Sequence, residues 1–204
     1  MTPSAYHQQL AAAKRTALVE AATDLFLRSG YDKTSLAAIA AAAGVSKATL
    51  FKQFPTKAAL FEAMVTDFWR LDEPAAELPP VGDLAAGLTV LGRRYVDLLT
   101  DPRMVALFRI VIAEAPRFPE LGQTQFRLGK APFFDSVRRY LEAEHAAGGV
   151  QVADPTMAAS QFLGMIADFV FWPRMLLVDW DPGAAKTTDV LAEAVATMRA
   201  RYQG

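Results

Sequence analysis

The side chains with the clearest potential for chemistry lie between Ser46 and Phe54. At the 100° per residue of an α-helix, Leu50 and Phe54 point to a common inner side, and Phe51 and Gln53 flank it. The opposite side is slim, polar and cationic, because it carries Ala48, Thr49 and Lys52. Such a face fits the major groove of DNA, which is about 12 Å wide. The segment is therefore a candidate DNA-reading helix, and the alternative is an ordinary helical hairpin.

Each functional candidate in this segment has two interpretations. Lys47 lies at the positive end of the helix and Lys52 lies on its outward face. One interpretation is that they contact phosphates or a guanine edge, and the alternative is that both are solvated surface lysines. Thr49 either binds a phosphate or is merely exposed. Gln53 either reads an adenine edge or caps a neighbouring chain end, and Phe51 either contacts a thymine methyl group or belongs to the core.

Phosphate contacts are also expected where the neighbouring helices begin. Thr56 and Lys57 start one helix, and Thr34 or Ser35 starts another. Backbone N–H groups and the helix dipole favour a phosphate at such positions. The complete set of candidate DNA contacts is Thr34, Ser35, Ser46, Lys47, Ala48, Thr49, Phe51, Lys52, Gln53, Thr56 and Lys57.

The distribution of charge supports a polyanionic partner for the N-terminal part. The chain has a net charge of −1, but residues 1–57 carry seven Lys and Arg against three Asp and Glu, a net of +4. Residues 58–204 carry fourteen against nineteen, a net of −5. A basic head on an acidic body indicates that the head meets a polyanion, although chance clustering on a solvated face gives the same excess.

Most other chemistries are excluded. The 204 residues include no cysteine and only two histidines, His7 and His145, so we expect no disulfide, no metal site and no cofactor. A Gly-rich phosphate loop and a Ser-His-Asp set are also missing, which leaves only paired carboxylates for an enzyme. We therefore expect a protein that is not an enzyme. Neither a signal peptide nor a membrane span is evident, so we expect a cytoplasmic protein.

The elements that position these residues are predicted to be helices throughout. We expect an all-α fold of about nine helices, made of a three-helix head with a helix-turn-helix and a C-terminal helical bundle. Pro74, Pro79, Pro80 and Gly82 mark a boundary, which gives a DNA-binding domain at 1–72 and a ligand-binding and dimerisation domain at 73–204. The helices expected after the boundary span residues 83–100, 102–115, 120–147, 155–179 and 183–202.

The body is rich in aromatic residues, which form either plain core or the lining of a cavity for an apolar or aromatic molecule. The helix expected at 155–179 is apolar around nearly its whole circumference, so we expect it to be buried on more than one side and to be interrupted at Pro173. Arg109, Glu114 and Asp168 lie on otherwise apolar helices; they orient a ligand, form internal ion pairs or face solvent. The candidate pocket residues are Trp69, Phe108, Val111, Ile112, Phe126, Phe134, Phe162, Met165, Ile166 and Phe169.

Dimerisation would let two short reading helices reach successive major grooves, about 34–36 Å apart. We expect the last two long helices to pair with their symmetry mates. The candidate contacts are Trp172, Met175, Leu191, Val195 and Met198.

The stretch TSLAAIAAAAGVSKATLFKQFPTKAALF, residues 34–61, follows Gly30-Tyr31 and closely resembles the DNA-binding head of TetR-type transcriptional regulators. Phe51 and Gln53 stand where that family often has Tyr followed by His or Tyr, so a phenol cannot bind phosphate at Phe51. Ala58 and Ala59 replace a frequent glutamate in the next helix.

The body is similar to the C-terminal domain of AcrR-like members, through LFRIVIAEAPRFPEL at 107–121 and QFLG at 161–164. This resemblance implies a homodimer formed by the last two helices, a ligand cavity in each body and repression of a palindromic operator that a small lipophilic or aromatic effector relieves. The alternative is a DNA-binding dimer that is constitutive or controlled by a protein partner.

Overall fold

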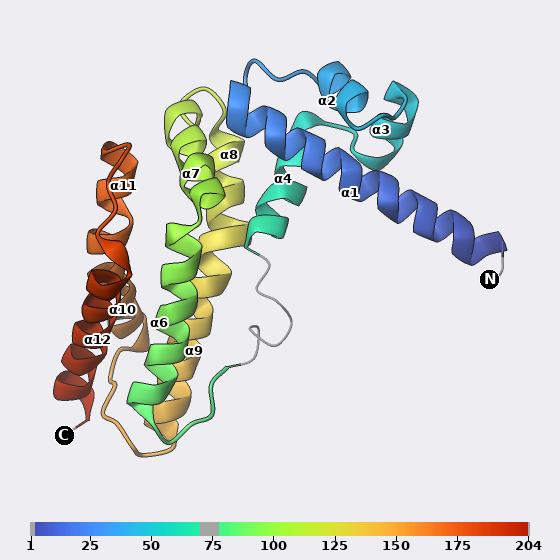
Figure 1. Ribbon diagram of the computed structural model, residues 1–204. Helices are drawn as coiled ribbons and strands as arrows, with labels where there is room; N and C mark the ends of the chain where they lie inside the picture. The colour runs from blue at the N-terminus through green and yellow to red at the C-terminus, as the bar shows by residue number, and fades with distance from the viewer. Residues whose placement is uncertain (1–2, 70–77, 204) are drawn as a thin grey trace. The chain divides into compact units, whose positions relative to one another are not determined.

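The computed structural model describes residues 3–69 and 78–203, and throughout these ranges the chain folds into helices without a β-strand (Figure 1). The expected all-α class is therefore confirmed. Within the same ranges, no helix combines the length and the apolar character needed to cross a membrane. No cluster of three or more His, Cys, Asp or Glu residues there could hold a metal ion.

Two compact units make up the chain. One contains residues 1–70 and 109–129, and the other contains residues 71–108 and 130–204. The expected boundary at 72/73 lies outside the described residues. Residues 109–129 belong to the compact unit of the head, although the sequence analysis assigned them to the body.

The head begins with four helices: α1 (Pro3–Ser29), α2 (Leu36–Ala42), α3 (Lys47–Gln53) and α4 (Lys57–Phe68). Ser35, Ser46 and Thr56 cap the last three, because each side-chain oxygen accepts the backbone N–H of the residue three positions later. α1 ends at Ser29, because the next residue, Gly30, has a φ of +81° that is readily adopted only by glycine. The helix starts expected at Thr34 or Ser35 and at Thr56 are confirmed, the first of them at Ser35.

α1 packs against both α2 and α4, and α2 packs against α3. The core between them consists of fully or almost fully buried apolar side chains, which include Leu18, Phe26, Ile39, Leu50, Phe54, Leu60 and Phe61. α8 (Pro119–Thr124) completes this unit by packing on α4. Because α2 and α3 contribute only seven residues each, this shared core is what keeps them folded.

α7 (Pro102–Glu114) and the π-helical segment η1 (Gln125–Lys130) are the elements in which the chain passes between the units. The second unit is built from α6 (Leu84–Thr100), α9 (Ala131–Ala146), α10 (Pro155–Val170), α11 (Trp172–Leu176) and α12 (Gly183–Tyr202). Within it, α12 lies against α6 and α10, and α9 lies against α6 and α10 (Figure 1).

Two of the long helices expected from the sequence are subdivided. Residues 120–147 form α8, η1 and α9, and Pro132 stands at the start of α9, where its missing N–H interrupts the α-helical ladder. Residues 155–179 form α10 and the short α11 with Pro173 at the junction, so the expected interruption is confirmed but the end at 179 is wrong. Periodicity alone continued both helices because apolar residues recur on both sides of each break.

Candidate nucleic-acid interface

The exposure of α3 side chains matches the face expected from helical periodicity. Leu50 is 0% and Phe54 2% exposed, so both belong to the core of the head. Lys47, Ala48 and Lys52 are exposed. Phe51 is 51% exposed and therefore lies outside the core, where an apolar contact with a thymine methyl group is sterically open to it. Gln53 is half-buried beside it.

The turn before α3 has the geometry of a helix-turn-helix. Gly44 adopts a φ of +64°, and the N–H of Val45 bonds to the carbonyl of Ala40 at 3.0 Å. Ala40 is 1% exposed, so the two short helices approach closely at a small residue. The glycine supplies the positive φ and the small side chain permits the close approach, as a tight turn between two short helices requires.

The hydroxyl groups at the helix starts are engaged locally. Ser46 Oγ accepts the N–H of Thr49 at 3.1 Å and lies 2.9 Å from Thr49 Oγ1 in a second hydrogen bond. Ser35 Oγ and Thr56 Oγ1 each accept a backbone N–H at 3.1 Å. Ser35, Ser46 and Thr56 are nevertheless exposed, so their remaining hydrogen-bonding capacity faces outward.

The structure removes Thr34 from the candidate DNA contacts. Thr34 is 4% exposed, and its hydroxyl donates to the carbonyls of Gly30 at 2.7 Å and Leu25 at 3.2 Å. The helix cap expected at Thr34 or Ser35 falls on Ser35. Thr34 instead closes the chain between α1 and α2.

Lys57 also differs from its expected role as a phosphate ligand. Its ammonium group donates to the carbonyls of Tyr31 at 2.7 Å, Thr34 at 3.0 Å and Asp32 at 3.3 Å. It also lies 4.3 Å from the centre of the Tyr31 ring, in cation–π geometry. Desolvation lowers the pKa of Lys57, and Asp32 and Glu114 oppose that change. The three donors of this lysine are therefore used within the chain.

Two residues of the head unit bind the segment between α1 and α2, and the sequence predicted this role for neither of them. Glu114 accepts the backbone N–H groups of Tyr31 and Asp32, and Arg117 forms an ion pair with Asp32 at 3.0 Å. Glu114 stood out in the sequence only as a charge on an apolar helix. Its partners lie more than 80 positions away, so no local pattern connects them.

The candidate pocket residues divide between the two compact units. Trp69, Val111, Ile112 and Phe126 belong to the unit of the head, and the others belong to the second unit. Ile112 and Phe126 are 54% and 60% exposed, whereas Phe162 and Ile166 are fully buried core. The assignment of all ten to an effector site stays a prediction.

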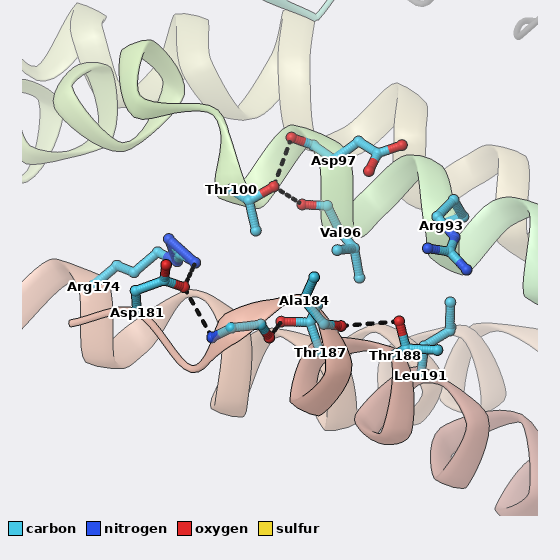
Figure 2. A pocket seen from close by; sticks show the side chains of 11 residues that line it. Arg93, Val96, Asp97, Thr100, Arg174, Asp181, Ala184, Thr187, Thr188 and Leu191 are labelled. Carbon is cyan, nitrogen blue, oxygen red and sulfur yellow. Dashed lines mark hydrogen bonds and ion pairs between the residues drawn. The ribbon is translucent and has the colours of Figure 1, made fainter.

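A pocket of about 310 Å³ in the second unit has a different lining (Figure 2). It lies between α6, α12 and the segment joining α11 to α12, and its charged residues are Arg93, Asp97, Arg174 and Asp181. Arg174 and Asp181 approach to 3.5 Å. This lining is mixed and polar, and it includes none of the aromatic residues proposed from the sequence.

The five candidate dimer contacts divide by exposure. Leu191, Val195 and Met198 are 3%, 7% and 1% exposed within a single chain, so their side chains offer little surface to a partner. They hold α12 against α6 and α10 instead. Trp172 is 51% exposed and Met175 is half-buried, so both keep surface available.

Together, the turn between α2 and α3 and the exposed cationic face of α3 define a helix-turn-helix DNA-binding protein. Family models match in both parts of the chain: bacterial regulatory proteins of the tetR family at residues 18–64, and the C-terminal domain of AefR-like transcriptional repressors at residues 86–204. The chain therefore belongs to the TetR family of transcriptional regulators, DNA-binding proteins that are not enzymes. The AefR-like match refines the AcrR-like resemblance of the body.

Solved structures agree with this assignment. A TetR-family transcriptional regulator from Mesorhizobium loti MAFF303099 is 28% identical, with a TM-score of 0.81 over 95% of this chain and 98% of its own. The flavonoid-responsive regulator FrrA is 31% identical, with a TM-score of 0.74 over 93% and 97%. A TetR family regulator from Pseudomonas syringae pv. tomato str. DC3000 is 28% identical, with a TM-score of 0.75 over 93% and 96%. A search of the curated proteins finds no match.

Proposed function

We propose that this regulator is a dimeric, sequence-specific repressor that a small lipophilic or aromatic molecule releases from a palindromic operator. The observation that carries the DNA-binding part is the exposed face of α3, where Lys47 and Lys52 stand beside Phe51. Lysines supply phosphate or guanine contacts, and Phe51 supplies an apolar contact to a base. Gln53, Thr49 and the exposed caps Ser35, Ser46 and Thr56 complete the proposed contact surface.

Dimerisation is proposed through the outer faces of α10 and α12. With Leu191, Val195 and Met198 turned inward, the outer face of α12 exposes small residues, among them Ala192 and Ala196. On α10 the exposed positions include Gly164, around which a methyl group would find open space. Small side chains permit close helix packing, and a two-fold axis would place two α3 helices on successive major grooves.

The proposed dimer can be tested by introducing a charged residue on the outer face of α12. Ala192→Glu places a carboxylate next to its symmetry mate and should shift the sedimenting mass from dimer to monomer at micromolar concentration. Ala146→Glu, at an exposed position on α9, is the matched control and should leave the mass unchanged. A wild-type protein that sediments as a monomer contradicts the dimer.

Release by an effector is supported by a buried side chain in η1. Gln125 is 3% exposed, and neither atom of its amide has a hydrogen-bond partner among the described residues. Unsatisfied buried polar groups are uncommon, and π-helical segments occur frequently at functional sites. An effector with one acceptor and one donor would satisfy this amide. The relative FrrA responds to flavonoids, which are aromatic and carry such groups.

The experiment has two stages. The purified protein first selects duplexes from a random library, and a panel of flavonoids is then screened for release of the selected duplex. An active compound should weaken binding by about 5–150-fold, the range of a coupling free energy of about 1–3 kcal/mol. Gln125→Leu should abolish release while keeping operator affinity, and Gln123→Leu, at an exposed position on α8, should change neither.

Two results would redirect this proposal. A selected duplex that no lipophilic or aromatic compound releases favours a constitutive or partner-controlled binder. Release that persists in Gln125→Leu removes this amide from the effector site.

A further inference from the structure

The loop between α1 and α2, residues 30–34, has its backbone groups bonded to two distant side chains. Its N–H groups at Tyr31 and Asp32 donate to Glu114 Oε1 and Oε2, each at 2.7 Å. Its carbonyl groups at Tyr31, Asp32 and Thr34 accept from Lys57 Nζ. A carboxylate therefore satisfies two N–H groups of this loop, and an ammonium group satisfies three of its carbonyls.

Glu114 reaches the loop because Gly30 has no side chain. A Cβ at Gly30 would lie 2.7 Å from Glu114 Oε1, a separation that real Cβ atoms essentially never show. Gly30 also needs its φ of +81° to end α1. The same glycine therefore turns the chain and leaves room for the carboxylate.

Side-chain contacts strengthen the same junction. The ring of Tyr31 packs edge-on against Phe61 of α4 at 5.7 Å and against Phe118 at 5.3 Å. Arg117 pairs with the Asp32 carboxylate at 3.0 Å, although both side chains are too exposed for a large energetic contribution. Glu114, Arg117 and Phe118 thus bring the corner between α7 and α8, residues 114–119, onto the loop that precedes α2.

The α7–α8 corner lies where a change in residues 109–129 can reach the reading helix. Residues 109–129 belong to the unit of the head, and the chain continues from both ends of this segment into the second unit. The loop held by Glu114 leads directly into α2, which packs on α3. Glu114 and α2 therefore connect residues 109–129 to the reading helix.

We propose that Glu114 is a positioning residue for DNA recognition. Its carboxylate holds the α1–α2 loop on the α7–α8 corner through two hydrogen bonds, and loss of these bonds lowers the preference of α3 for its operator. This inference rests on the proposed function. Glu114 itself touches no DNA in it. Non-specific affinity depends on exposed lysines and remains, because a displaced α3 still presents its positive charge.

The first test measures directly whether Glu114 protects the backbone amides of the α1–α2 loop. In hydrogen exchange followed by NMR, the amides of Tyr31 and Asp32 should exchange faster in Glu114→Ala, while the amides of α2 and α3 stay protected. Glu114→Gln keeps the shape but only one acceptor oxygen, so it should show a smaller increase. Glu120→Gln, at an exposed position in the first turn of α8 next to the corner, is the matched control and should match wild type.

The second test measures the ratio of affinities for the duplex selected by the wild-type protein and a scrambled duplex. The ratio should fall at least about 5-fold in Glu114→Ala, the lower end of typical coupling between sites, and less in Glu114→Gln. Affinity for the scrambled duplex should stay within 2-fold, roughly the scatter expected for an unchanged phosphate surface.

Three results overturn the inference: unchanged exchange at Tyr31 and Asp32, faster exchange with an unchanged affinity ratio, or equal loss of affinity for both duplexes. If Glu114→Ala unfolds the head, an unchanged ratio in Glu114→Gln overturns it. A wild-type protein without any sequence preference defeats the proposed function instead, and the exchange experiment then still decides whether Glu114 holds the loop.

Discussion

Lys52 and Lys57 lie five positions apart and carry the same charge, but their side chains have different surroundings in the structure. Lys52 is exposed on the outward face of α3, whereas Lys57 donates to three backbone carbonyls. We predict that Lys52→Ala changes the salt dependence of DNA binding and that Lys57→Ala changes the stability of the head.

The magnitudes follow from the number of contacts. Each phosphate neutralised contributes about 0.9 to the slope of log K against log salt, so a dimer that loses two Lys52 contacts should lose about 1.8. The slope should not change in Lys57→Ala. That variant should instead lose about 2–4 kcal/mol of unfolding free energy, the equivalent of one to two charge-assisted hydrogen bonds after allowance for the partial exposure of the site.

The assays are fluorescence anisotropy on a scrambled duplex between about 50 and 300 mM KCl, where phosphate contacts dominate, and urea unfolding of the free protein. Lys130→Ala removes an exposed lysine at the start of α9 and controls for net charge. A slope that falls by the same amount in Lys57→Ala, with unchanged unfolding, would refute the internal role of this lysine.

Two further predictions concern the second unit. In Gly87→Ala, the new Cβ would lie 1.9 Å from Tyr140 Oη, so urea unfolding should show a loss of about 1–3 kcal/mol. The control is Gly122→Ala on α8, whose new Cβ would meet Ala115 Cβ at an ordinary 3.6 Å and should cause no loss. Burial raises the pKa of Tyr95 to about 12, so this residue contributes stability below pH 10 that is lost as the pH rises toward 12. Tyr31 and Tyr140 also have pKa values raised by burial, so part of the loss remains in Tyr95→Phe. In urea unfolding, the wild-type protein should lose about 2–3 kcal/mol more than Tyr95→Phe over this pH range; an equal pH dependence in both proteins would contradict this origin.

The head could be predicted from sequence because its signals are local. Ser35, Ser46 and Thr56 each cap the helix that begins at the next residue, and Gly44 turns the chain between the first two of these helices. Helical periodicity then separates the inner Leu50 from the outer Lys52. Such signals depend on neighbours within one or two turns.

The roles of Thr34, Lys57 and Glu114 could not be predicted, because each depends on hydrogen-bond partners outside its own helix. Thr34 binds carbonyls at the end of α1, whereas Lys57 and Glu114 bind a loop that lies far from them in the sequence. A lysine at a helix start looks the same in sequence whether it faces phosphate or three carbonyls. The apolar periodicity of α12 likewise identified its buried side, but it could not say that α6 and α10 of the same chain already cover that side.

The most direct test of the central claim is the ratio of dissociation constants for the selected duplex and its scrambled version, measured by fluorescence anisotropy at one physiological salt concentration. The account predicts a ratio of at least about 10³ for the wild-type protein, the lower end for specific DNA-binding proteins. It also predicts that the selected sequence has two-fold symmetry, with half-sites about 10 base pairs apart or a multiple of that spacing. Equal affinity for the two duplexes would contradict the claim that α3 reads DNA sequence.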